Sequence, residues 1–144
     1  MKTYIPQVDP HNKKWWVLDL DGVILGRAAI KVADVLRGKD KPIFTPHLDT
    51  GDHVVVVNAR NVKVTGTLKP LQMKYYHYSG YPGGLRETTF EKMLLKKPEE
   101  VFRLAVRRML PKNKLGRKMI KKLHVYADTR HPHKAQKPEV LSLR

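Results

Sequence analysis

A run of four consecutive valines, Val54–Val57, constrains the fold of this chain more than any other feature. Valine is branched at Cβ and packs well on a pleated strand, and four in succession place apolar side chains on both faces of that strand. A strand that is apolar on both faces is typical of the centre of a covered, largely parallel sheet. The sequence therefore predicts an α/β protein.

The residues before the valine run predict a strand, a turn and a helix. Residues 15–20, WWVLDL, are mostly aromatic or aliphatic and favour a strand, and residues 21–22, DG, favour a turn. From residue 27 to residue 37 apolar side chains recur at spacings of three and four, as in a helix with one buried face. Gly38 follows as a helix stop. This order is the opening of an α/β unit.

The rest of the chain predicts shorter elements within one domain. Thr88 and Glu91 have the spacing of a capping box that opens a helix, and Pro98 begins another helix that Pro111 ends. Further expectations are strands at 53–58, 74–78 and 123–126, loops at 39–52, 67–72 and 79–84, and an amphipathic helix within 107–122. We expect a single domain over residues 1–144, with extended arms at 1–14 and 128–144.

The charge balance indicates a polyanionic partner. The 144 residues include 29 lysines and arginines against 13 acids, a formal net charge of +16. The excess is uneven, because residues 73–144 hold 18 of the cations and 6 of the acids. A folded chain with this balance is typical of proteins that bind nucleic acid.

The composition also indicates in which cellular compartment the protein acts. The chain has no cysteine, which excludes disulfides and cysteine-ligated zinc and fits a reducing environment. Residues 1–16 lack the apolar segment of a signal peptide, and no run approaches the roughly 20 apolar residues of a membrane span. We therefore expect a cytoplasmic protein that does not act at a membrane.

Residues 74–86, KYYHYSGYPGGLR, are the first candidate RNA-binding segment. They combine four tyrosines and three glycines with cationic ends and no acid. Tyrosine rings stack on bases, and glycines let bare N–H groups approach phosphates. The alternative is a strand and a plain surface loop, and strand alternation leaves open whether Tyr75 or the pair Tyr76 and Tyr78 is exposed. The candidate residues are Lys74, Tyr76, His77, Ser79, Tyr81, Gly83, Gly84 and Arg86.

Residues 107–122, RRMLPKNKLGRKMIKK, are the second candidate segment. They hold eight cations in sixteen positions without an acid. Such a block neutralises a phosphate backbone and releases its counterions, whereas the alternative reading is a solvated helical face. The absence of interleaved acids and the proline-broken loop favour nucleic acid. The candidate residues are Arg107, Arg108, Lys112, Lys114, Arg117, Lys118 and Lys121.

One enzymatic alternative comes from residues 17–24, VLDLDGVI. A strand that ends in D-x-D-G resembles the first motif of haloacid-dehalogenase-type phosphatases, in which Asp19 would be the nucleophile and Asp21 the general acid/base beside magnesium. That chemistry needs a further acidic pair after a later strand, and the C-terminal half offers none. The closest histidine pair, His131 and His133, lacks the usual spacing of a metal site. We therefore expect no catalysis, no metal and no small-molecule substrate.

Several long, ordered motifs then resemble the bacterial ribosomal protein L13 family. They are LGRAA at 25–29, TPHLDTGDHVVVVNA at 45–59, VTG at 64–66, YYHYSGYPGGLR at 75–86, AVRRMLPKNKLGR at 105–117, LHVYA at 123–127 and HPHKAQKPE at 131–139. The resemblance covers nearly the whole chain.

The resemblance implies an α/β/α sandwich of three layers around a mostly parallel four-stranded sheet. It also implies a structural role in the large ribosomal subunit, with direct binding to large-subunit ribosomal RNA early in assembly, neighbouring ribosomal proteins as partners and no cofactor. By position it assigns RNA contacts to the SGYPGG loop, to the PKNKLGRK segment and to the HPHKAQ stretch. The last of these adds His131, His133 and Lys134 to the candidate residues.

Overall fold

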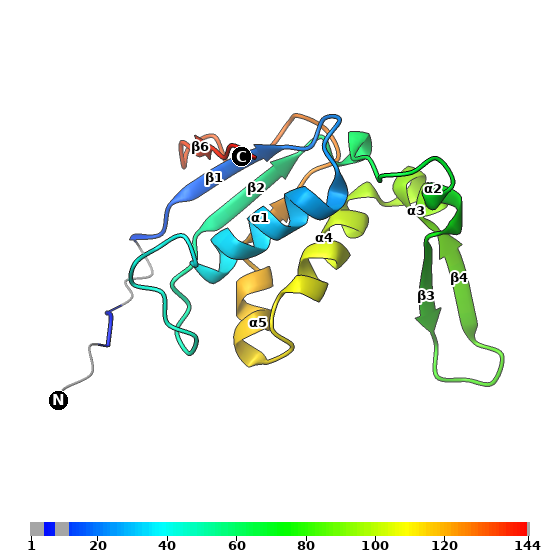
Figure 1. The fold of residues 1–144 in the computed structure, drawn as a ribbon, viewed down its shortest axis with the longest axis horizontal. Helices are drawn as coiled ribbons and strands as arrows, with labels where there is room; N and C mark the ends of the chain where they lie inside the picture. The colour runs from blue at the N-terminus through cyan, green and yellow to red at the C-terminus, as the bar shows by residue number, and fades with distance from the viewer. Residues whose placement is uncertain (1–4, 8–11, 144) are drawn as a thin grey trace.

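The computed structural model describes residues 5–7 and 12–143 (Figure 1). Part of the arm predicted over residues 1–14 therefore lies outside the described residues. The elements are β1 (Trp15–Asp19), α1 (Leu25–Arg37), β2 (His53–Val57), η2 (Ala59–Asn61), α2 (Lys69–Gln72), β3 (Lys74–Tyr78), β4 (Leu85–Thr89), α3 (Phe90–Lys96), α4 (Pro98–Met109), α5 (Lys114–Ile120), β5 (Leu123–Val125) and β6 (Glu139–Val140).

The central sheet has four strands in the order β5-β2-β1-β6, and each neighbouring pair is parallel. The valine run lies in β2, between β1 and β5, and Val54–Val57 are all buried. An α/β fold with a mostly parallel four-stranded sheet flanked by helices is thus confirmed. The inner position of β2 accounts for its run of valines, because a strand in the middle of a covered sheet is shielded from water on both faces.

One face of the sheet and three helices make the main core. Val54 and Val56 point to this face together with Leu18 of β1. The helices α1, α4 and α5 pack against it, and Phe102 of α4 is fully buried there. Each fully buried aliphatic or aromatic side chain of this kind contributes about 1.5–3 kcal/mol through burial. This core positions the cationic end of α4.

The opposite face of the sheet is covered by a group of rings. Trp15 stacks on His53 with ring centroids 4.3 Å apart, and His124 lies 5.5 Å from the same indole. His133 joins them from the C-terminal segment, 4.5 Å from His124 and 5.1 Å from Trp15. We call Trp15, His53, His124 and His133 the ring cluster. It fastens the chain after β5 to the sheet.

A network of buried charges holds the 39–52 connection. Lys122 is 5% exposed, and its ammonium group donates to an Asp49 carboxylate oxygen and to the Leu36 carbonyl. Lys13 donates to the other Asp49 oxygen at 2.9 Å. Burial alone would raise the pKa of Asp49, but the bonds and charges of Lys122 and Lys13 outweigh it and hold that pKa below its usual value. The network joins α1, the connection and the start of β5.

A two-stranded arm extends from this body (Figure 1). Strands β3 and β4 pair antiparallel, from Lys74 opposite Thr89 to Tyr78 opposite Leu85, and helices α2 and α3 lie at the base of the hairpin. Tyr75 is buried at that base, and the amide of Phe90 donates to the Met73 carbonyl at 2.8 Å. The base is therefore packed, whereas the tip of the hairpin is free of the body.

Several local predictions need correction. The capping box was wrong, because Thr88 lies in β4, and α3 begins at Phe90 after an N-cap Thr89 whose side chain makes no capping bond. Residues 69–72 form the short helix α2 where a loop was expected. Helix α1 begins at Leu25, two residues before the predicted start. Within the predicted C-terminal arm, β6 adds a fourth strand beside β1.

Candidate nucleic-acid interface

The hairpin presents its tyrosines in the two ways that strand alternation allows. Tyr75 is 7% exposed and faces the body, whereas Tyr76 is 61% exposed and Tyr78 is 62% exposed. Tyr81, in the loop between the strands, is 76% exposed. Large apolar rings at this exposure on a projecting element suit stacking on bases. The structure thus shows that the Tyr76 and Tyr78 face of β3 is exposed to solvent, a question that the sequence left open.

The loop of the hairpin is held in one shape by short contacts. The Gly84 amide donates to the Tyr81 carbonyl at 2.9 Å, and Gly83 has a φ of 71°, which favours glycine. A Cβ added at Gly84 would lie 2.1 Å from the Ser79 hydroxyl oxygen. Ser79 and Gly84 therefore shape the loop by close packing.

One cation of the hairpin pairs with a carboxylate and another does not. Lys74 pairs with Glu87 across the two strands at 2.7 Å, and the bond to Glu87 raises the pKa of Lys74. His77 stands opposite Arg86 in the register, and both are exposed. No carboxylate of the described residues pairs with Arg86, so its guanidinium is available to an anion.

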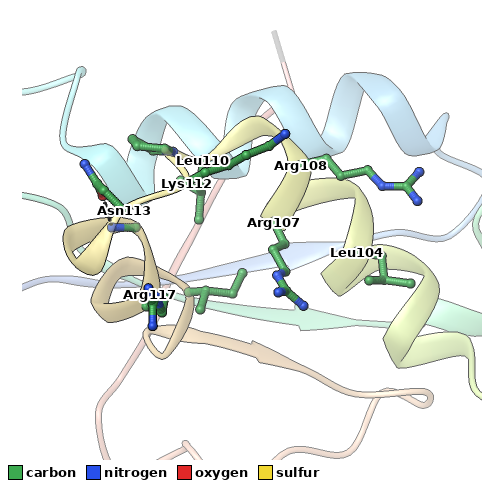
Figure 2. Close-up of a pocket in the computed structure, with 10 residues that line it drawn as sticks. Leu104, Arg107, Arg108, Leu110, Lys112, Asn113 and Arg117 are labelled. Carbon is green, nitrogen blue, oxygen red and sulfur yellow. Dashed lines mark hydrogen bonds between the residues drawn. The ribbon is translucent and has the colours of Figure 1, made fainter. Parts of the chain in front are cut away.

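A second feature is a cavity of about 590 Å³ between α4 and α5 (Figure 2). We call it the α4–α5 cavity. Its lining brings together four of the predicted site residues, Arg107, Arg108, Lys112 and Arg117. The other lining residues are Leu104, Leu110, Pro111, Asn113, Gly116 and Ile120. Among the residues that line it there is no acid.

The turn between the two helices fixes the shape of this cavity. Leu110 follows α4 and is buried in the core, so the chain is anchored where the helix ends. The side-chain oxygen of Asn113 accepts a bond from the Gly116 amide at 2.7 Å and caps α5. A Cβ at Gly116 would lie 1.8 Å from the Pro111 carbonyl oxygen, so only glycine fits there. The turn that joins α4 to α5 is thus held in one conformation by these contacts.

Arg108 has a second contact outside the cavity. Its guanidinium carbon lies 5.9 Å from the centre of the Tyr75 ring, within the range of a cation–π interaction. Figure 2 shows the Arg108 side chain directed away from α5, whereas Arg107 projects into the space between the helices. Arg108 therefore links α4 to the base of the hairpin.

We call the seven candidate cations between residues 107 and 121 the basic block. Among the described residues some cations of the body pair with carboxylates, whereas others, such as Arg27, Arg37 and Lys63, do not. Body cations such as Lys13, Lys41 and Lys122 pair with carboxylates, and so do Lys31, Lys39, Arg60 and Arg103. Over the described part of the chain, no such ion pair involves the seven candidate cations of the basic block. All seven are exposed: Arg107, Arg108, Lys112, Lys114, Arg117, Lys118 and Lys121. Their charge is left for an external anion.

The third predicted segment is divided between the core and the surface. His133 belongs to the ring cluster, and its Nε2 lies 2.8 Å from the Tyr126 hydroxyl. Burial lowers the pKa of His133, and the nearby His131 lowers it further, so the neutral ring is favoured. Lys134 is exposed, and His131 is half-buried. The structure does not bring these three residues to the α4–α5 cavity, whose lining excludes them.

The residues of the phosphatase alternative are tied into a turn. The Asp19 carboxylate accepts bonds from the Asp21 amide at 2.9 Å and from the Asn58 side chain at 2.8 Å. The Asp21 carboxylate accepts a bond from Asn61 at 3.0 Å. Gly22 has a φ of 68°, as the predicted turn requires. This arrangement gives the phosphatase alternative no support.

The described residues lack the features of two other classes of site. No group of three or more histidine, cysteine, aspartate or glutamate side chains among them has the arrangement of a metal site. None of their helices combines the length and the apolar character that crossing a bilayer requires.

Sequence reasoning missed some residues of the candidate interface. Tyr78 was not among the candidates, although its exposure equals that of Tyr76. The apolar floor of the α4–α5 cavity, Leu104, Leu110 and Ile120, was also missed. The signal for Tyr78 was its shared strand face with Tyr76. The signal for the floor was absent, because these positions look like the core side of amphipathic helices.

Comparisons with known proteins agree on one family. Residues 13–132 match the family model described as Ribosomal protein L13. The large ribosomal subunit protein uL13 of Maridesulfovibrio salexigens is 58% identical over 141 residues, covering 98% of this chain and 99% of that protein. The proteins of the same name from Aquifex aeolicus and Clostridium kluyveri are 54% and 58% identical, each covering 100% of this chain and 99% of the relative.

Proposed function

The chain belongs to the ribosomal protein L13 family, and from this premise we propose that it is a structural constituent of the large ribosomal subunit in the cytoplasm. It binds large-subunit ribosomal RNA directly, contributes to early subunit assembly and meets neighbouring ribosomal proteins there. It carries out no catalysis and needs no cofactor. The observation that carries the proposal is the set of exposed cations on residues 107–121 without carboxylate partners in the described structure.

The basic block supplies most of the affinity. Its cations neutralise phosphates and release the counterions condensed on the RNA, so the gain is entropic and depends on salt. The Asn113 cap and the close approach of Gly116 to Pro111 fix the backbone of the α4–α5 turn, which carries Lys112 and joins the helices of Arg107 and Arg117. Less backbone freedom is then lost on binding than with a disordered basic tail.

The hairpin supplies a second and different contact. Tyr76, Tyr78 and Tyr81 offer ring faces to unpaired bases, and each stacked base contributes about 1–3 kcal/mol. Arg86 and the glycine amides of the loop meet the adjoining phosphates. Because the hairpin extends from the body that carries the basic block, the two contacts bridge RNA segments that would otherwise repel each other (Figure 1).

In the C-terminal segment, the RNA contact passes mainly through Lys134. Lys134 is exposed, whereas His133 is occupied by the ring cluster and by Tyr126. His131 is half-buried beside them and contributes at the edge. This segment is the smallest of the three proposed contacts.

The test is the binding of the full-length protein to a transcript of large-subunit ribosomal RNA at several salt concentrations. If about six phosphates are neutralised, affinity falls at least about a thousandfold between about 50 and 200 mM salt. Duplex DNA of equal length serves as competitor, and the structured RNA must win. Equal affinity for the two would replace the proposal by non-specific packing of nucleic acid, and a flat salt profile would refute the electrostatic mechanism.

A further inference from the structure

We propose that the α4–α5 cavity takes up one nucleotide that is splayed out of the RNA chain, with its base against the apolar floor and its phosphate at the cationic rim. The inference rests on the proposed function and adds a discrete nucleotide site to a surface otherwise defined by charge. Its ligand is an unpaired nucleotide of a bulge, a loop or a single-stranded end.

The floor of the cavity has no use in binding phosphate alone. Leu104 and Ile120 line it and are partly buried against the core, whereas Leu110, at 5% exposure, belongs to the core itself. A surface that contacts only a phosphate backbone needs charge and hydrogen-bond donors, which water-exposed lysines on a flat helix face would supply. Apolar side chains recessed behind such donors suit a ligand with one flat, poorly hydrated part and one anionic part. A nucleotide has both.

The rim supplies the donors for the anionic part. Arg107 projects from α4 toward α5, and Arg117 and Lys112 border the same cavity (Figure 2). Guanidinium groups bind phosphate through paired donors and also stack on bases through their planar faces. Asn113 cannot offer its oxygen freely, because that oxygen caps the Gly116 amide. The side chains of the rim therefore present donors, which matches the acceptor atoms of phosphates and base edges.

The size and rigidity of the cavity agree with a single nucleotide. Its volume of about 590 Å³ lies within the roughly 300–1,000 Å³ of pockets for small ligands. A base inside a helix is stacked on both faces and paired at its edge, so only an unstacked nucleotide can reach the floor. The close approach of Gly116 to Pro111 fixes the turn that borders the cavity. Binding then requires little rearrangement.

The experiment is a titration of the isotope-labelled full-length protein, followed by the amide chemical shifts of residues 104–120. Three probes are used separately: inorganic phosphate, ribose 5-phosphate and adenosine 5′-monophosphate. We expect the mononucleotide to bind these residues in the millimolar range, at least about tenfold more tightly than phosphate. Ribose 5-phosphate should resemble phosphate, because it lacks the base. Equal affinities for all three probes would overturn the proposal and leave the cavity as a phosphate contact.

Variants separate the floor from the rim. Leu104→Trp fills the floor without changing the charge, and it should remove the preference for the mononucleotide over phosphate. Leu95→Trp is the matched control, because Leu95 on α3 is 81% exposed and outside the cavity, and it should keep the preference. Arg107→Met, at an exposed position, should weaken the binding of all three probes. A preference that survives Leu104→Trp in a folded variant would overturn the proposal.

The two proposals fail in different ways. Binding of the wild-type protein to the ribosomal RNA transcript without any preference for the mononucleotide would refute the nucleotide site and leave the proposed function standing. Absence of binding to the transcript would refute the proposed function itself. We expect the wild-type protein to bind the transcript tightly and to prefer the mononucleotide over phosphate. Leu104→Trp should bind the transcript more weakly than Leu95→Trp.

Discussion

Lys121 and Lys122 are neighbours in the cationic segment 107–122, yet their environments are opposite. Lys122 is buried against Asp49 and the Leu36 carbonyl, whereas Lys121 is exposed. Burial lowers the pKa of Lys122, and the bond to Asp49 opposes that shift. The density of positive charge could not separate the two residues. Only the approach of the 39–52 connection to the start of β5 does, and that is a long-range contact.

Replacing each lysine by methionine should therefore separate stability from binding. Lys122→Met leaves the half-buried Asp49 with Lys13 alone, and we expect a loss of about 2–3 kcal/mol in the free energy of unfolding. Lys121→Met should leave stability within about 0.5 kcal/mol and weaken RNA binding at low salt. Urea unfolding and RNA binding of the folded proteins measure the two effects. Equal stability of the two variants would contradict the role given to Lys122.

In the β3–β4 hairpin, stability and RNA binding should likewise depend on different residues. Tyr75 faces the body and lies under the Arg108 guanidinium, whereas Tyr76 and Tyr78 face solvent. Tyr75→Ala should destabilise the protein by about 3 kcal/mol, because a packed ring leaves a cavity. The double variant Tyr76→Ala/Tyr78→Ala should unfold like the wild type and bind ribosomal RNA roughly 5- to 150-fold more weakly, if one base stacks there.

Thermal unfolding and RNA affinity of the same two variants provide the measurement. Tyr81→Phe is the control, since it keeps the ring and removes only the hydroxyl group. The proposed stacking surface would have to be abandoned if the double variant bound RNA as well as the wild type does.

Elements formed by local patterns were predictable, and those formed by distant partners were not. The valine run and the periodicity of residues 27–37 carry their own signals, and both elements are present. Strand β4 includes Arg86 and Glu87 and has no alternation of its own, so its conformation comes from pairing with β3. Strand β6 has two exposed residues and exists because β1 lies beside it. The cations of the candidate interface were predicted from composition, whereas the apolar floor beside them depends on how α4 meets α5.

The ring cluster should make the stability of the whole molecule depend on pH, because it joins β1, β2, β5 and the C-terminal segment. Burial lowers the pKa of His53, His124 and His133. An unfolded histidine titrates near 6.5, so just below that pH the unfolded chain binds more protons than the folded chain. The charged or titratable groups that act on the cluster from outside it are Lys13, Asp49 and Lys122 at His53, Arg103 at His124, and His131 at His133.

Stability should therefore be complete above about pH 6.5 and decrease as the pH falls below it. We expect the melting temperature to drop between about pH 7 and pH 5, and His124→Phe, which keeps a ring in the stack, should reduce that drop. His47→Phe is the matched control, because His47 is exposed and lies outside the cluster. A melting temperature with the same pH dependence in wild type and His124→Phe would show that the cluster does not titrate on unfolding.

The net charge of +16 acts on the whole molecule in two opposite directions. In the free protein the cations of residues 107–121, which have no carboxylate partner among the described residues, repel one another, and salt screens that repulsion over a Debye length of about 10 Å at 0.1 M. In the complex the same cations contact phosphates, and salt competes with them. Raising the salt from about 0.05 to 0.3 M should therefore raise the melting temperature of the free protein and weaken its RNA complex. Because one set of charges causes both effects, the double variant Lys114→Gln/Lys118→Gln should reduce both salt dependences together. A variant that changed only one of them would show that self-repulsion and RNA binding use different cations.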